Sequence, residues 1–255
     1  MTVEVLEKDK LNLTIKVEGY PLDLVNGLRR YAMSEVPTLA IEDVVFIENS
    51  SLVYDESLAQ RLGLVPLKTP KKYLDMEDAQ LMLVLDASAE DSVRTVYSGD
   101  LVPVEDKEVK PVSNEIPILK LAPKQNIKLE AYARLGKGKK HSKYSPTSKA
   151  IVKPTPVINI KNPKTENAKK IVDSCPRNVF EITDGNLIAK NPYSCTYCEE
   201  CLKVDKESLE ITEKPGSYIF GVESIGQLEA KDIVIESANL IIKDLDEIEK
   251  RLDSL

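Results

Sequence analysis

Residues 175–201 read CPRNVFEITDGNLIAKNPYSCTYCEEC, and this stretch contains all four cysteines of a 255-residue chain. Cys195, Cys198 and Cys201 follow the spacing C-x2-C-x2-C, whereas Cys175 lies 20 residues upstream and directly precedes Pro176. Three sulfur ligands on one tight turn suit a multi-iron cluster, because its irons occupy separate vertices that lie close together. The stretch therefore predicts an iron–sulfur cluster in a module that is a small part of the chain.

The same spacing is found in bacterial-type ferredoxins, where a distant Cys-Pro supplies the fourth thiolate. One structural zinc ion is an alternative, although zinc sites favour two C-x2-C pairs separated by about 12 to 20 residues. Disulfides or free thiols are a further alternative. We predict one [4Fe–4S] cluster, or a [3Fe–4S] cluster if one thiolate is not engaged, with the ligands Cys175, Cys195, Cys198 and Cys201.

A second cluster is not expected. A two-cluster ferredoxin would place its other cysteines four residues after Cys201 and four, seven and ten residues before Cys175. Those positions hold Asp205, Ile171, Ala168 and Thr165. Between the cysteines, the segment 176–189 has the pattern of two short strands joined by an Asp-Gly turn, which also fits half of a ferredoxin.

Composition and charge limit the function classes. The chain has 42% hydrophobic and 30% charged residues, which is typical of a globular protein, and its formal net charge is −7. An acidic chain is not expected to bind nucleic acid broadly, because such binding needs an excess of Lys and Arg. The sequence has no apolar run of about 18 residues and no signal-peptide pattern at its start. We expect a cytoplasmic protein that does not enter a membrane, in a compartment where thiols stay reduced.

The remaining pattern alternates strands and helices. Strict alternation predicts a strand over residues 10–18, Pro21 opens a helix over 22–35, and an apolar run predicts a strand over 39–47. A short helix over 54–62 ends at Gly63, and residues 79–160 are mostly strand with many prolines. The chain ends in a long helix, about 229–253, whose apolar residues follow a heptad seam: Val234, Ala238, Ile241, Leu245, Ile248 and Leu252. This seam packs either on its own domain or on a partner subunit.

Catalytic motifs are missing from the sequence. His141 is the only histidine, the cysteines are assigned to the cluster, and no Gly-rich phosphate loop occurs. The basic run Gly136–Lys143 is either a solvated hairpin loop or a contact loop for a partner or a nucleic-acid backbone. We therefore expect a chain that does not itself catalyse a reaction.

Five segments carry a resemblance to a known family. They are VNGLRR at 25–30, SEVPTLAI at 34–41, YDE at 54–56, RLGLVPL at 61–67 and GKGKKHSKYSP at 136–146. In combination they resemble the α-type assembly subunits of multisubunit RNA polymerases, and in particular the archaeal D subunits, some of which also carry a ferredoxin-like insert. The resemblance covers essentially the whole chain.

The resemblance implies an α+β fold with three parts. A dimerisation domain like that of the polymerase α subunit would comprise 1–39 plus 214–255, a mainly β insert domain 40–157, and a ferredoxin-like [4Fe–4S] module 158–213. The terminal helices would pair with the L subunit. The N and P subunits and the large catalytic subunits would be further partners, and DNA would be met only through the complex.

By this resemblance, the chain is a non-catalytic assembly platform of DNA-directed RNA polymerase, the enzyme that transcribes DNA into RNA. The cluster would be structural or redox-responsive. The alternative from another class is a ferredoxin-type electron-transfer protein.

Overall fold

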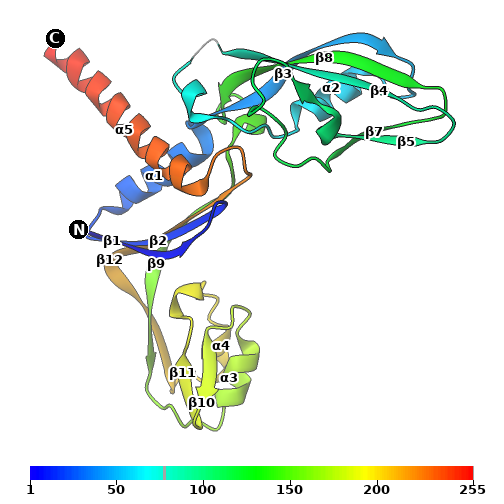
Figure 1. Ribbon diagram of the computed structural model, residues 1–255. Helices are drawn as coiled ribbons and strands as arrows, with labels where there is room; N and C mark the ends of the chain where they lie inside the picture. The colour runs from blue at the N-terminus through cyan, green and yellow to red at the C-terminus, as the bar shows by residue number, and fades with distance from the viewer. Residues whose placement is uncertain (77–78, 255) are drawn as a thin grey trace. The chain divides into compact units, whose positions relative to one another are not determined.

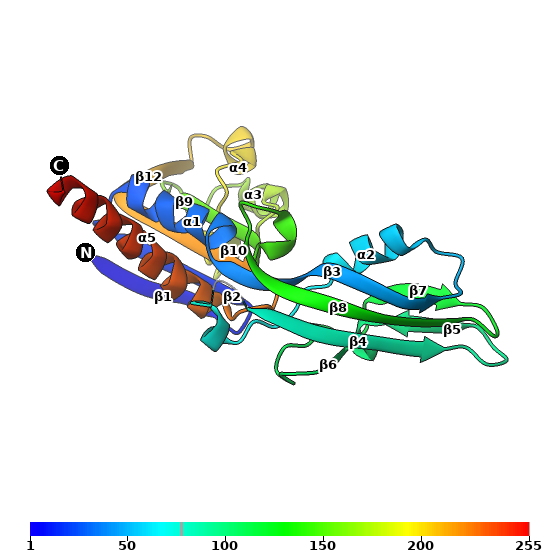
Figure 2. The ribbon, with the colours of Figure 1, turned by 90° about the horizontal axis from the view of Figure 1, so that it is seen from above.

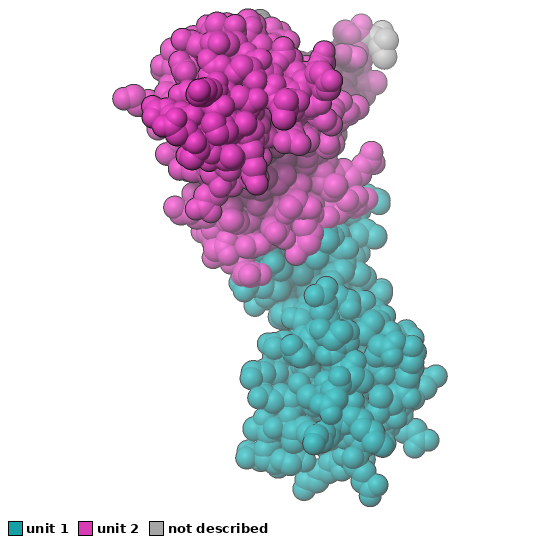
Figure 3. Space-filling view, turned by 90° about the vertical axis from the view of Figure 1, so that its right-hand side faces the viewer, with its two compact units in different colours: residues 1–6, 14–25, 151–220 teal, residues 7–13, 26–150, 221–255 magenta. Residues whose placement is uncertain are grey.

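The computed structural model describes residues 1–76 and 79–254. By internal contacts the chain divides into two compact units, one made of residues 1–6, 14–25 and 151–220 and the other of residues 7–13, 26–150 and 221–255 (Figure 3). Both predicted boundaries of the cysteine module fall within strands, at 157/158 in β9 (Thr147–Ile160) and at 213/214 in β12 (Leu209–Ser224). The three-part division stays a prediction.

One four-stranded sheet has the order β1-β2-β12-β9, with β1 (Thr2–Lys8) and β2 (Asn12–Glu18) at the N-terminus of the chain. Two helices, α1 (Leu22–Ser34) and α5 (Ala230–Asp253), lie side by side in Figures 1 and 2. The Tyr31 hydroxyl of α1 donates to the Asp244 carboxylate of α5 at 2.6 Å. The predicted helices over 22–35 and 229–253 are confirmed.

The second four-stranded sheet, β3-β8-β4-β6, is antiparallel and forms the largest core. Its strands are β3 (Pro37–Asn49), β4 (Gln80–Ser88), β6 (Val102–Pro103) and β8 (Asn126–Lys137). Every second residue of β4 and β8 is buried, as period-two alternation requires for a sheet with one covered face. That core also includes residues of α2 (Asp55–Gly63) and of the small sheet formed by β5 (Arg94–Tyr97) and β7 (Pro117–Leu121).

The cysteine segment forms a small module with its own core. Helix α3 (Ala168–Ser174) is followed by the hairpin β10 (Phe180–Thr183) and β11 (Asn186–Ala189), and then by the short helix α4 (Glu200–Val204). Asp184 and Gly185 link the two strands with positive φ angles of 50° and 76°. This is the geometry of a type I′ turn, so the predicted Asp-Gly hairpin is confirmed.

No helix among the described residues is long and apolar enough to cross a membrane.

Two glycines provide a first test of the packing. A Cβ on Gly138 would lie 2.3 Å from the backbone oxygen of Met33, whereas a Cβ on Gly27 in α1 would meet nothing closer than Ile241 Cδ1 at 4.0 Å. We expect Gly138→Ala to lower the free energy of unfolding by about 1–3 kcal/mol, because backbone must shift to make room. Gly27→Ala should be neutral or stabilise by up to about 1 kcal/mol through helix propensity. Urea unfolding of both variants checks this, and equal effects would contradict it.

Candidate functional site

The structure gathers all four cysteines around one small cavity, as the spacing predicts. Cys175 ends α3, Cys195 follows the short turn Pro192–Ser194, Cys198 lies in the loop before α4, and Cys201 belongs to α4. Cys195 and Cys201 are buried in the module core, Cys198 is exposed, and all four are free thiols. Val179, Phe180 and Ile211 also line the cavity and make it largely apolar.

Burial raises the pKa of the Cys201 thiol to about 11, and the neighbouring Cys175, Cys195 and Cys198 raise it further in the same direction. Burial and the three neighbouring sulfurs thus disfavour ionisation of Cys201. The loop between Cys195 and Cys201 is also strained, because Tyr197 and Glu199 adopt positive φ angles of 56° and 59°.

Lys153 reinforces the cysteine loop from strand β9. Its ammonium donates to the backbone oxygens of Tyr193 at 2.6 Å and of Cys195 at 2.7 Å. Arg177 and Glu199 line the cavity itself, so one cation and one anion border the four thiols. Among the described residues, no group of three or more His, Cys, Asp or Glu side chains is arranged to hold a single metal ion.

The positions that a second cluster would need are occupied by other interactions. The Thr165 hydroxyl donates to the Asp205 carboxylate at 2.7 Å, and the Ser208 backbone N–H donates to the same carboxylate at 3.0 Å. The Thr165 hydrogen bond is the largest cause that lowers the pKa of Asp205 to about 2. Ala168 and Ile171 are buried in the module core. Hydrogen bonds of Asp205 and Thr165 and the apolar packing of Ala168 and Ile171 thus occupy the positions at which a two-cluster ferredoxin has its second set of thiolates.

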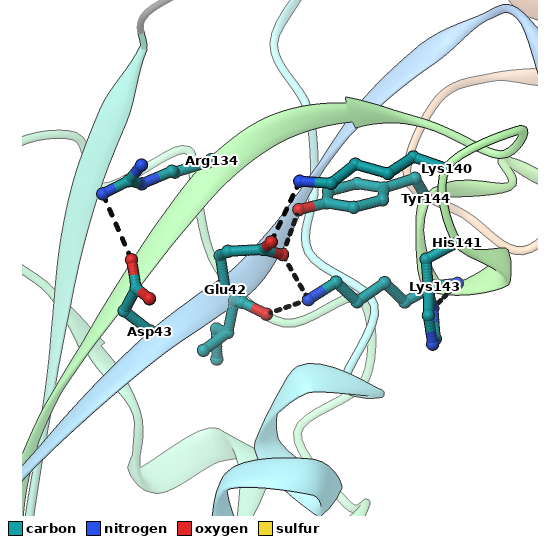
Figure 4. A network of polar contacts seen from close by, with 8 residues as sticks. Glu42, Asp43, Arg134, Lys140, His141, Lys143 and Tyr144 are labelled. Atoms are coloured by element: carbon teal, nitrogen blue, oxygen red, sulfur yellow. Dashed lines mark hydrogen bonds and ion pairs between the residues drawn. The ribbon is translucent and has the colours of Figure 1, made fainter.

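The basic run at 136–143 forms a tethered loop between β8 and β9 (Figure 4). Lys140, Lys143 and the Tyr144 hydroxyl all contact the Glu42 carboxylate of β3, and the Lys143 ammonium also donates to the Ile41 backbone oxygen at 2.9 Å. Lys137 pairs with Glu35 at 3.2 Å. These lysines are largely neutralised within the chain, so the loop is a structural tether. The other alternative, contact with a partner or a nucleic-acid backbone, stays open.

The heptad seam of α5 is half-buried in its first part and exposed further along. Val234, Ala238 and Ile241 are half-buried, and the buried residues of the helix, Ala230, Ile233 and Ser237, lie outside the seam. Leu245, Ile248 and Leu252 are exposed by 59%, 54% and 62%, and Ile242 beside them by 56%. An apolar stripe of this kind on a helix is typical of a surface that another chain covers.

Comparison with known proteins shows similarity over nearly the whole chain. Residues 45–160 match the family model of the RNA polymerase Rpb3/RpoA insert domain. The chain is 38% identical over 254 residues to a DNA-directed RNA polymerase subunit Rpo3 of Pyrobaculum arsenaticum, covering 94% of this chain and 92% of the relative. It is 33% identical to that of Methanosphaera stadtmanae, with 97% of each chain covered. It is also 31% identical to the DNA-directed RNA polymerases I and III subunit rpac1 of Dictyostelium discoideum, covering 99% of this chain and 82% of the relative.

These matches define an α-like, non-catalytic subunit of a multisubunit RNA polymerase, with an insert domain of the Rpb3/RpoA type. The chain belongs to the Rpo3 family of DNA-directed RNA polymerase subunits.

The Glu42 network makes stability depend on pH. Hydrogen bonds from Lys143 and then Tyr144 lower the pKa of the Glu42 carboxyl from 4.5 to about 2. Because the folded pKa is the lower one, the stabilisation is present above about pH 5 and is lost as the pH falls towards 2. We expect Glu42→Gln to lower the free energy of unfolding by about 1–3 kcal/mol at pH 7, and by progressively less below pH 5.

Thermal unfolding between pH 2.5 and pH 7 measures this dependence. Glu48→Gln, on an exposed position of the same strand, is the matched control and should change little at any pH. A Glu42→Gln difference that stays constant across this range would contradict the prediction.

Proposed function

We propose that this chain is the assembly platform on which the polymerase forms, and that its first step is pairing with the L subunit. The exposed apolar half of α5 is the observation that carries the proposal. Fully covering one Leu or Ile side chain gives roughly 1.5–3 kcal/mol, so a helix that buries four of them on a partner supplies a stable contact. The fold alone leaves these residues in water, at 54–62% exposure.

The N and P subunits and the large catalytic subunits are the further partners in this proposal. Helix α1 carries Arg29 and the exposed Arg30. Arg29 is held in place by a hydrogen bond from its Nε to the Asn26 side chain at 2.9 Å. A fixed and an exposed guanidinium on one helix suit recognition of carboxylates on a large subunit.

Charge placed on the α5 stripe tests the pairing. We expect Leu245→Glu with Ile248→Glu to weaken binding to the L subunit at least about 100-fold, because two carboxylates would lose water in an apolar contact. The isolated chain should keep its helix content and unfolding temperature, since both residues are already exposed. Lys243→Glu with Lys250→Glu, on the opposite face of α5, is the matched control.

Size-exclusion chromatography of the co-expressed pair, followed by calorimetric titration, measures this effect. Undiminished pairing of the Leu245/Ile248 variant would remove α5 from the interface.

We propose further that Cys175, Cys195, Cys198 and Cys201 hold one iron–sulfur cluster, a [4Fe–4S] cluster or a [3Fe–4S] cluster. The donor set supports this fit: four free thiols surround one largely apolar cavity, and Lys153 holds the backbone of Cys195 in place. The thiolates of a cubane bind separate irons and do not have to converge on one point. When bound, the cluster would supply metal–thiolate cross-links and a redox-active centre.

In that site, the four cysteines would hold the module together through their bonds to the cluster. The core around the cysteines is small, and the loop between Cys195 and Cys201 is strained. Metal–thiolate bonds would therefore contribute a large part of the folding free energy of residues 158–213. Electron transfer, the alternative function, has no support from the relatives, whose similarity extends over the whole polymerase subunit.

Replacing the thiols tests the cluster. Anaerobically purified wild-type protein should contain about four irons and four sulfides per chain, or about three irons for the smaller cluster. Cys195→Ser with Cys201→Ser should lose both and expose residues 158–213 to proteolysis, while pairing with the L subunit persists. Ser174→Ala with Ser194→Ala is the control in the same module and should keep its iron. Zinc in place of iron and sulfide, or a protected module in the cysteine variant, would contradict the proposal.

A further inference from the structure

A wide groove lies away from the cysteines, within the unit formed by residues 7–13, 26–150 and 221–255. Four segments line it: residues 9–12, 68–71, 107–112 and 226–232. Its volume is about 1030 Å³, and it is open to solvent along one side. That space is far larger than a water molecule or a simple ion needs, and it is suited to a segment of chain.

The carboxylates around the groove are mostly committed within the protein. Asp9 accepts from the backbone N–H groups of Leu11 and Asn12, both at 2.7 Å. Asp232 pairs with Lys71 at 2.8 Å, and Glu108 lies 3.8 Å from Lys72. Their negative charge is thus largely offset before any partner arrives.

Four lysines of the groove are different. Lys10, Lys68, Lys107 and Lys110 are exposed, and no carboxylate of the described residues lies within ion-pair distance of them. The last three come from two segments that are joined by a backbone hydrogen bond, since the Lys68 N–H donates to the Lys110 oxygen at 2.8 Å. The groove therefore presents a fixed set of uncompensated positive charges on a chain whose net charge is −7.

The groove also has apolar surface between these charges. Leu11 is 46% exposed at one wall, Val112 is half-buried, and Leu228 is buried beneath. A polyphosphate chain gains nothing from such an apolar surface. A polypeptide that alternates carboxylates with apolar side chains complements both the lysines and the apolar wall.

We propose that this groove binds an acidic, partly apolar segment of another polymerase subunit. The inference rests on the proposed role of the chain as an assembly platform and adds a second contact surface to it, separate from the stripe of α5. Lys68, Lys107 and Lys110 bind carboxylates of the segment. An apolar side chain between those carboxylates packs on Leu11 and Val112.

Zero-length cross-linking in the purified, nucleic-acid-free polymerase tests the proposal. A carbodiimide joins an ammonium to a carboxylate only where the two are in contact. We expect peptides in which Lys68, Lys107 or Lys110 is joined to Asp or Glu of one segment of another subunit. Acetylation of the same lysines should be at least about tenfold slower in the polymerase than in the isolated chain.

Charge reversal provides the functional test. Lys68→Glu with Lys107→Glu and Lys110→Glu should lower incorporation of the cross-linked subunit at least about tenfold, while binding to the L subunit is unchanged. Lys164→Glu with Lys169→Glu and Lys170→Glu makes the same change of net charge on exposed lysines of the cysteine module and should have no such effect.

Each failure is distinguishable. Absence of the chain from the purified polymerase would overturn the proposed function itself. If the chain is present but its groove lysines react as fast as in isolation and form no cross-link, only the groove proposal fails. Protection that occurs only when DNA or RNA is bound would overturn it too, because nucleic acid and not a polypeptide would then occupy the groove.

Discussion

The antiparallel pairing of β3 with β8 is the constraint on which the insert half of the structure depends. It runs from Pro37 opposite Lys137 to Asn49 opposite Ile127, and a one-residue slip would turn its buried face to water. The Glu42 network fixes this register at the end of β8, because Lys140, Lys143 and Tyr144 close onto β3 directly after the strand ends. Burial raises the pKa of Tyr144, and the hydrogen bond to Glu42 adds to that effect. The buried Tyr144 hydroxyl thus joins the loop after β8 to strand β3.

Much of this fold follows from local sequence patterns. Alternation predicts β2, an apolar run predicts most of β3, proline and helical periodicity predict α1, and an Asp-Gly pair predicts the β10–β11 hairpin. The C-terminal helix is also found within one residue at its N-terminal end. The signal missed is β1, where Val3 and Val5 alternate with polar residues but remain exposed. An edge strand that covers no core has no buried face, so its hydrophobic pattern is a weak signal in the sequence.

Other features depend on contacts between distant segments, and no spacing rule reports them. The Lys-rich run gives no hint that Glu35 and Glu42 neutralise it, since those carboxylates lie about a hundred residues away. Likewise, Lys-Pro-Gly at 214–216 reads as a break, yet β12 continues through it, with Gly216 at a φ of 65°. Four segments line the groove, so the sequence pattern of no single segment predicts it. The gathering of the cysteines was easier to predict, because three of them lie within seven consecutive residues.

Three surfaces of this chain share one physical property: each holds groups whose interactions are incomplete within the single chain. The far half of α5 leaves apolar side chains in water, the cysteine cavity gathers four free thiols, and the groove holds lysines without carboxylates within ion-pair distance. Each deficit differs in kind, so under the proposals made above each would be relieved by a different component, an apolar helix, a metal cluster or an acidic segment. Because the deficits do not overlap in chemistry, the components cannot exchange places. A chain without catalytic residues can in this way determine the composition of a complex by specifying what each of its surfaces lacks.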